Sequence, residues 1–203
     1  MKDYQKETID TYEKNLDLYL SRTPKENAGC FKEFLDNYIE QLPVDPLILE
    51  LGSGTGRDAN YIEKNSKVKI MRTDIASSFI NYQEEAFGIS VKYLDALDLD
   101  ESEKYDSMLA IAVLLHFEKE DCKSVCTNIY RALKQNGSLA FRIKAKLTES
   151  VSEITSQKME SPRYFYYWEP SEFLDMLEKI GFTCDNITQV DNGKWIQGVA
   201  YKK

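Results

Sequence analysis

The sequence predicts an α/β fold with a Rossmann-like, doubly wound and mostly parallel sheet that helices cover on both faces. From Leu47 onward, short apolar strand patterns alternate with helical ones, which is typical of right-handed βαβ units. The last two strand patterns are separated only by the turn residues DNG, so these strands must be antiparallel. A parallel sheet that ends in an antiparallel hairpin is uncommon, so this combination leaves few candidate folds.

The first forty residues predict two helices, because apolar side chains recur there at helical spacing on either side of SRTPKENAG. Pro43 and Pro46 end helical structure before the first strand. The apolar patterns that follow predict strands over residues 47–51, 68–72, 91–94, 105–115 and 137–143, with helices over 57–64, 77–87 and 119–134 between them.

A stretch without clear periodicity, residues 145–169, follows the fifth strand and is a candidate acceptor-side insertion. It ends at a helix start, where Pro170 suits the first turn and Trp168 and Phe173 have the spacing of a hydrophobic staple. Gly181 closes that helix. We expect one domain over residues 1–203, with a helical N-terminal segment over 1–42.

Composition favours a small-molecule partner. The chain carries a formal net charge of -8 and no basic block, whereas nucleic-acid binding needs clustered Lys and Arg, so no nucleic acid is expected. No apolar run is long enough to cross a membrane and the N-terminus has no signal-peptide pattern, so a cytoplasmic protein is expected. An acidic surface without an obvious exposed apolar stripe favours a monomer or weak homodimer. The four cysteines lack CxxC spacing and there is a single histidine, so no metal site is expected.

A glycine-rich turn follows the first strand in ELGSGTGRDA. Gly52, Gly54 and Gly56 form GxGxG, which with the following helix makes a cradle for a nucleotide-like ligand at the carboxyl edge of the sheet. The spacing is one residue short of the dinucleotide fingerprint, and Arg57 stands where its third glycine would be.

Glu50, just ahead of this loop, discriminates between ligands. A carboxylate there repels a pyrophosphate but suits a ligand that presents an ammonium or sulfonium cation. S-adenosylmethionine (SAM) presents both, and its carboxylate suits the loop amides and the guanidinium fork of Arg57. We therefore expect SAM as cofactor and S-adenosylhomocysteine as product.

Two further acidic residues follow successive strands. Asp74 lies about 20 residues beyond the loop, where a carboxylate accepts hydrogen bonds from ribose hydroxyls, and Ile75 offers an apolar face for adenine. Asp95 is a candidate acceptor for the adenine amino group, with Ala96 and Leu97 beside the ring. The alternative for either aspartate is a helix cap or a turn.

These motifs resemble those of the class I SAM-dependent methyltransferases, and the resemblance extends from about Leu47 to the C-terminus. It rests on ELGSGTGRDA, RTDIAS, YLDALDL, YDSMLAIAVLLHF and LKQNGSLAFRIK. The GRDA loop, the LLH after the fourth strand and the RYFYYW segment resemble a subgroup of small bacterial-type members. The resemblance implies a seven-stranded sheet with an antiparallel last strand, and it matches Glu50 and the three glycines to the methionine end of SAM, Asp74 to the ribose, and Asp95 with Leu97 to the adenine.

The sequence signals for the methyl-acceptor site are less specific than those for the cofactor site. His116 follows the central strand at the same sheet edge as the glycine loop, so it is a candidate general base or acceptor-orienting group; the alternative is a histidine bonded to a nearby backbone carbonyl. In SPRYFYYWEP, Tyr166 and Trp168 are candidates for a pocket wall and Arg163 for binding a substrate carboxylate or phosphate; the alternative is that these aromatics cover the core.

In this family the N-terminal segment often closes over the cofactor, so Tyr12 and Tyr19 are candidates for a lid that contacts acceptor and cofactor, or else pack on the helices of the sheet. Arg142 and Lys144, at the end of the fifth strand, are candidates for the same cavity. Two other functions stay open: a SAM-binding regulatory subunit without transferase activity, and a nicotinamide-dependent oxidoreductase, which Glu50 and the terminal hairpin disfavour.

Overall fold

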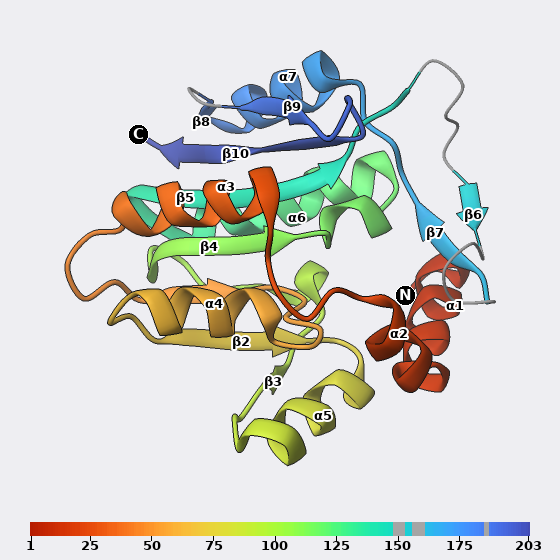
Figure 1. The fold of residues 1–203 in the computed structure, drawn as a ribbon. Coiled ribbons are helices and arrows are strands. Elements are labelled where there is room, and N and C mark those ends of the chain that lie inside the picture. The colour runs from red at the N-terminus through yellow and green to blue at the C-terminus, as the bar shows by residue number, and fades with distance from the viewer. Residues whose placement is uncertain (148–152, 156–160, 185–186) are drawn as a thin grey trace.

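The computed structural model describes residues 1–147, 153–155, 161–184 and 187–203 and shows one mixed sheet between two layers of helices (Figure 1). The sheet order is β3-β2-β1-β4-β5-β10-β8, and β9 pairs with β10 beside β8. The strands are β1 (Ile48–Glu50), β2 (Ile70–Asp74), β3 (Lys92–Tyr93), β4 (Tyr105–Ile111), β5 (Leu133–Lys144), β8 (Phe182–Thr183), β9 (Thr188–Val190) and β10 (Trp195–Lys202).

The predicted hairpin is confirmed, since β10 is antiparallel both to β5 and to β9. Two short strands, β8 and β9, both pair with β10 on the side away from β5. The edge of the expected seven-stranded sheet is therefore formed by two strands instead of one. β1 pairs in parallel with β2 on one side and β4 on the other, with Glu50 opposite Arg72 and Leu109. The strand order reverses at this point, which is where open α/β sheets bind ligands.

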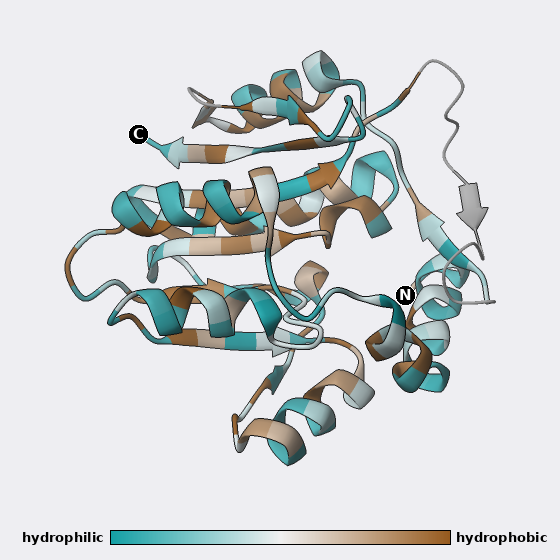
Figure 2. Cartoon of the chain, in the orientation of Figure 1, coloured by the Kyte–Doolittle hydropathy of each residue, from teal (hydrophilic) through white to brown (hydrophobic). Residues whose placement is uncertain are grey.

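Each face of the sheet has its own hydrophobic core. Figure 2 shows hydrophobic residues along the central strands and hydrophilic ones over much of the outward helix surface. On one face, Leu35 of α3 (Gly29–Glu40) and Ile62 of α4 (Arg57–Asn65) pack with Leu109. On the other face, α6 (Lys119–Ala132) and α7 (Pro170–Ile180) pack through Val125 and Phe173. The predicted staple is present, with the rings of Trp168 and Phe173 5.2 Å apart.

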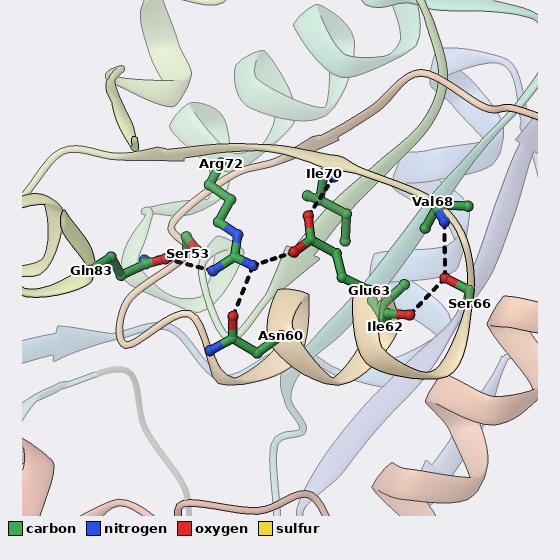
Figure 3. A network of polar contacts seen from close by, with 9 residues as sticks. All are labelled: Ser53, Asn60, Ile62, Glu63, Ser66, Val68, Ile70, Arg72 and Gln83. Atoms are coloured by element: carbon green, nitrogen blue, oxygen red, sulfur yellow. Dashed lines mark hydrogen bonds and ion pairs between the residues drawn. The ribbon is translucent and has the colours of Figure 1, made fainter. Parts of the chain in front are cut away.

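A buried polar network joins α4 and β2 to α5 (Ser77–Phe87) (Figure 3). The Arg72 guanidinium, 3% exposed, donates to Gln83 Oε1 (2.8 Å), Asn60 Oδ1 (2.9 Å) and Glu63 Oε2 (2.7 Å). Gln83 in turn donates to Ser53 Oγ (3.0 Å) and to the Gly54 carbonyl. The network therefore ties the glycine loop to the two helices beside it.

Apart from element ends that shift by up to four residues, as where β5 begins at Leu133, the structure differs from the predicted elements in three places. The first predicted helix is broken at Asn15 into α1 (Asp3–Lys14) and α2 (Leu16–Arg22), because the backbone of Asn15 leaves the helical region while its side chain bonds the Thr11 carbonyl. β4 ends at Ile111 rather than Leu115, because Ala112 has a positive φ of 56° and the short 3-10 helix η2 (Leu114–His116) follows.

The third difference lies in residues 145–169, where the sequence pattern gives no regular element. β6 (Glu153–Thr155) and β7 (Arg163–Phe165) form a separate antiparallel pair there. Both strands are only three residues long, too short for an alternation to be recognised. Part of the predicted insertion, residues 148–152 and 156–160, lies outside the described residues.

The N-terminal helices lie beside the carboxyl ends of the parallel strands, next to β7 (Figure 1). The Tyr164 amide donates to Thr8 Oγ1 (2.9 Å), and Thr11 donates to the Pro162 carbonyl (2.6 Å). The Glu13 carboxylate accepts from the Ser77 and Ser78 amides at the start of α5. α1 is thus attached on two sides of the sheet edge.

Within the described part of the chain, no helix is long and apolar enough to span a membrane. The same residues contain no group of three or more His, Cys, Asp or Glu side chains placed to hold a metal ion.

Candidate functional site

The glycine loop adopts a conformation that its residue types require. Gly52 and Gly56 have φ values of 61° and 75°. A Cβ at Gly52 would lie 2.5 Å from Val113 Cγ2, and one at Gly56 would lie 2.5 Å from Gln83 Oε1. Both the left-handed backbone and the close packing therefore exclude other residues. Gly56 is also the N-cap of α4, so the amides of the first turn have no side-chain cap.

A cavity lies between this loop, the ends of β2, β3 and β4, and helix α1. Most of the predicted cofactor residues line it: Gly52, Gly54, Arg57, Asp74, Ile75, Asp95, Ala96 and Tyr19. Tyr12 and His116, predicted for the acceptor side, line it as well. One continuous cavity therefore joins the two halves of the predicted site.

Glu50 lies below the loop, only 3% exposed, and is not among the described residues that line the cavity. Its Oε2 is buried without a hydrogen-bond partner. Burial raises the pKa of Glu50 to about 8, against the hydrogen bond from Ser53. The guanidinium of Arg72, its neighbour on β2, is directed to Gln83, Asn60 and Glu63 instead. The carboxyl group is thus an acceptor that the chain itself leaves partly unused.

Asp74 connects β2 to the loop. Its Oδ2 accepts from the Gly54 amide (2.7 Å) and its Oδ1 from the Ala76 amide (2.9 Å). Burial raises the pKa of Asp74 to about 6, while the backbone amides of Ala76, Gly54 and Ile75 oppose this. The side chain is therefore mostly ionised at pH 7 and holds the loop in place while facing the cavity.

The residues that follow β3 both cap a short helix and form part of the cavity wall. Asp95 Oδ1 accepts from the Leu97 amide (3.0 Å) and so caps the 3-10 helix η1 (Ala96–Asp98), as its alternative interpretation predicted, and it still lines the cavity. Leu97 is not among the lining residues and packs against the core instead, because its position on η1 directs it inward. Leu94 and Phe117 are the apolar side chains that line this part of the cavity.

Arg57 lines the opposite end of the cavity. Its Nε donates to Asp58 Oδ1 (2.7 Å), so part of the guanidinium fork is already used by the next residue in the chain. Asp58, Tyr19 and Thr23 line the same end.

A directed chain of hydrogen bonds runs along the acceptor side. His116 Nδ1 lies 2.8 Å from the Tyr164 carbonyl oxygen, which only accepts, so Nδ1 carries the proton and Nε2 is the acceptor. The Tyr12 hydroxyl, 3.0 Å away, donates to Nε2 and itself accepts from Arg163 Nη1 (3.2 Å). Both functions considered for His116, a cavity-facing group and a carbonyl-bonded histidine, are thus combined in one residue.

Burial keeps both rings of this chain neutral. It lowers the pKa of His116 to about 4, and the nearby Arg163 charge acts in the same direction. Burial also raises the pKa of Tyr12 well above its ordinary value. Neither side chain changes its protonation state near pH 7.

Five predicted acceptor-side residues are absent from the described cavity lining: Arg163, Trp168, Tyr166, Arg142 and Lys144. Trp168 is fully buried against Tyr166 and Phe173, so these aromatics cover the core, as the alternative interpretation stated.

Arg142 lies between the rings of Phe31 (4.4 Å) and Trp195 (4.8 Å) and forms an ion pair with Asp191, and the Lys144 ammonium lies 3.9 Å from the Trp195 ring centre. The two residues share one face of β5, the α3 face, because they are two positions apart.

Sequence reasoning expected Tyr12 to face the cavity but missed the other lining residues of α1. Its residues Gln5, Thr8 and Ile9 line the cavity beside Tyr12, and Phe79 of α5 packs against Tyr12 (5.5 Å between ring centres). Positions 5, 8, 9 and 12 have the spacing of one helical face, so the signal was present. It was weak because Gln5 and Thr8 are polar.

These features define a cofactor site at the switch point of a methyltransferase-type α/β sheet, and comparisons with known proteins agree. Residues 48–137 match the methyltransferase domain family. This part of the chain is a class I SAM-dependent methyltransferase domain, and its cofactor is SAM.

A malonyl-[acyl-carrier protein] O-methyltransferase from Acetivibrio thermocellus is 25% identical over 227 residues, covering 85% of this chain and 80% of that protein. Among solved structures, 1,6-didemethyltoxoflavin-N1-methyltransferase from Burkholderia thailandensis, with its bound substrate and S-adenosylhomocysteine, has a TM-score of 0.71 at 16% identity and covers 98% of this chain and 87% of that one. The [4+2]-cyclase SpnF also has a TM-score of 0.71 at 16% identity, over 98% and 94% of the two chains. These structural likenesses therefore establish the fold and not the reaction.

The residues present fit SAM on three observations. The unpartnered Oε2 of Glu50 suits a cation near the loop. Gly54 lines the cavity and has open space within 4 Å of where its Cβ would stand, so a ligand can approach the loop backbone. Asp74 faces the cavity as an acceptor.

Proposed function

We propose that this methyltransferase acts on a small molecule that enters the cavity beside Tyr12 and His116. The observation that carries the proposal is the continuity of the cavity from Asp95, at the adenine end, to Tyr12 and His116. Helix α1 covers this end, which leaves room for a compact acceptor. The formal charge of -8 disfavours nucleic acid.

The activities named for similar proteins support a small acceptor, or a small group carried on a protein. One relative methylates malonyl groups on an acyl-carrier protein, one neighbour acts on 1,6-didemethyltoxoflavin, and another from Galdieria sulphuraria is described as a sarcosine dimethylglycine methyltransferase. These acceptors differ in nucleophile and size, so the acceptor of this chain must be argued from its own residues.

The cofactor residues have the following proposed roles. The loop at Gly52, Gly54 and Gly56 receives the methionine end, with Glu50 below it as counter-charge for the ammonium and Arg57 and Tyr19 at the carboxylate. Asp74 accepts from the ribose hydroxyls, and Asp95 accepts from adenine between Ile75 and Ala96. When bound, SAM supplies a methyl group on a sulfonium that a nucleophile displaces.

His116 acts as an orienting group rather than as the base. Its lone pair at Nε2 is engaged by Tyr12, and burial with the neighbouring Arg163 charge keeps the imidazole neutral, with a pKa of about 4. A base of that strength removes few protons at pH 7, whereas a neutral pair of fixed hydrogen-bonding groups holds an acceptor in place.

The covering segment is shorter than the predicted residues 1–42. α3 buries Phe31, Leu35 and Tyr38 in the main core, while α1 and α2 carry the residues that face the cavity. We therefore assign the lid to residues 3–22.

The proposal is tested by methyl transfer from methyl-labelled SAM to a panel of small acceptors grouped by nucleophile: carboxylates, phenols, amines, thiols and acidic carbons. The account predicts transfer to at least one small-molecule group, lost in a double variant of Glu50→Gln and Asp74→Ala. Labelling of protein or nucleic acid in a cell extract, with no transfer to the panel, would contradict it.

A further inference from the structure

Arg163 is a buried cation that no described carboxylate neutralises. The residue begins β7, is 5% exposed, and forms no ion pair with any described residue. The two other buried arginines are compensated: Arg72 pairs with Glu63 (Figure 3) and Arg142 pairs with Asp191. Since a buried charge without a partner is unfavourable, Arg163 needs a counter-ion from outside the described structure.

The free part of Arg163 has the shape of a carboxylate-binding fork. Its hydrogen bond uses Nη1, which donates to the Tyr12 hydroxyl, while Nε is buried without a partner. The guanidinium lies 5.5 Å from the ring centre of Tyr12 and 5.1 Å from that of Phe165, which hold it between them. An Nε–Nη2 edge left open in this way accepts a carboxylate through two parallel hydrogen bonds.

Arg163 is also next to the acceptor end of the cavity. It does not line the cavity itself, but Tyr12 does, and a single hydrogen bond separates the two. Tyr12 belongs to α1, which contacts β7 through the Thr8 hydrogen bond and the Tyr4–Tyr164 rings, and α5 through Glu13. A carboxylate in the cavity therefore reaches the guanidinium only when the Tyr12 side chain gives way.

The neighbouring groups favour an acceptor that arrives already ionised. The Tyr12–His116 pair is neutral and its hydrogen bonds are mutually satisfied, so it offers no strong base to deprotonate an alcohol or amine. An anionic acceptor needs no such base, and its charge is complementary to both the guanidinium and a sulfonium.

We propose that the methyl acceptor is a small carboxylic acid whose carboxylate becomes the counter-ion of Arg163. A carboxylate oxygen would form the new bond to the methyl carbon as the S–CH3 bond of SAM breaks, giving a methyl ester and neutral S-adenosylhomocysteine as the leaving group, with no proton to remove. The inference rests on the proposed function, since it places the acceptor in the same cavity. Tyr12 and His116 then orient the bound acid as neutral hydrogen-bonding groups.

The single histidine of the chain makes the test selective. Protein saturated with S-adenosylhomocysteine at pH 7 is titrated with acetate, glutarate and benzoate, and in parallel with the corresponding amides, while NMR follows the His116 side-chain resonances. At least one carboxylate is expected to shift them saturably and to bind ten-fold or more tightly than its amide. Arg163→Gln should weaken that carboxylate at least ten-fold, whereas Arg131→Gln, on the exposed surface of α6, should change it less than two-fold.

If Arg163→Gln does not fold, as judged by circular dichroism, Arg163→Lys replaces it. Lysine keeps the charge but loses the fork, so the preference for carboxylate over amide should fall at least three-fold. Equal binding of carboxylates and amides, or carboxylate binding unaffected by the Arg163 variant, would overturn the inference. Failure to bind S-adenosylhomocysteine in the first place would instead overturn the proposed function.

Discussion

Glu50→Gln should make the stability of the protein less sensitive to pH. In the folded protein, burial raises the pKa of Glu50 from an ordinary value of 4.5 to about 8, and its Oε2 has no partner. The folded state therefore binds this proton more tightly than the unfolded state. The stabilising contribution is complete below pH 4.5 and is lost as the pH rises through about 8.

The expected size follows from linkage. Each unit of pKa difference corresponds to about 1.4 kcal/mol, and between pH 6 and pH 8 the Glu50 contribution to the free energy of unfolding falls by about 2 kcal/mol. Glutamine has nearly the same shape and no charge, so the variant lacks this decrease. Asp74 and His116 also titrate differently in the two states, but their contributions are common to both proteins and cancel in the comparison.

Urea denaturation followed by circular dichroism at pH 6 and pH 8 measures the difference. Between these pH values, the wild-type free energy of unfolding should decrease by about 2 kcal/mol more than that of the variant. Equal pH dependence in the two proteins would refute the argument that Glu50 is buried without compensation.

Three further results are expected. Gly56→Ala should destabilise the protein by at least about 1 kcal/mol in the same urea assay, because its φ is 75° and the added Cβ would lie 2.5 Å from Gln83 Oε1; unchanged stability would contradict the loop geometry. His116→Gln should lower turnover of an identified acceptor ten-fold or more while the affinity for S-adenosylhomocysteine, measured by calorimetry, changes less than two-fold; equal activity would remove the residue from the mechanism. Deleting residues 1–20 should weaken S-adenosylhomocysteine binding at least ten-fold by equilibrium dialysis, since α1 and Tyr19 line the cavity, and normal affinity in a folded variant would contradict the lid.

The fold could be predicted from the sequence because each pattern that indicates it spans only a few neighbouring residues. Strand–helix alternation, the glycine loop and the DNG turn are sequential features, and they correctly predicted the sheet, its crevice and the terminal hairpin. That most of the predicted cofactor residues line one cavity followed as well, because the ends of parallel strands meet at one edge of the sheet.

Features that depend on distant contacts were not predictable. The Arg72 network joins residues from β2, α4 and α5, and nothing local distinguishes Arg72 from an exposed arginine. Trp168 illustrates a second limit: an aromatic side chain fits both a pocket wall and a core, and only its packing on Phe173 and Tyr166 decides between them. Leu97 was placed beside adenine by its position in the motif, but the turn of η1 directs it into the core.

The most direct measurement is a calorimetric titration of the purified protein with S-adenosylhomocysteine and, separately, with NADH. Wild-type protein and Asp100→Ala, an exposed carboxylate just beyond the site, should bind S-adenosylhomocysteine with the same affinity. Asp74→Ala should lose most of this binding while remaining folded, and NADH should give no binding heat with any of the three. Tight binding of NADH, or S-adenosylhomocysteine binding that survives in Asp74→Ala, would contradict the assignment of this cavity as the cofactor site.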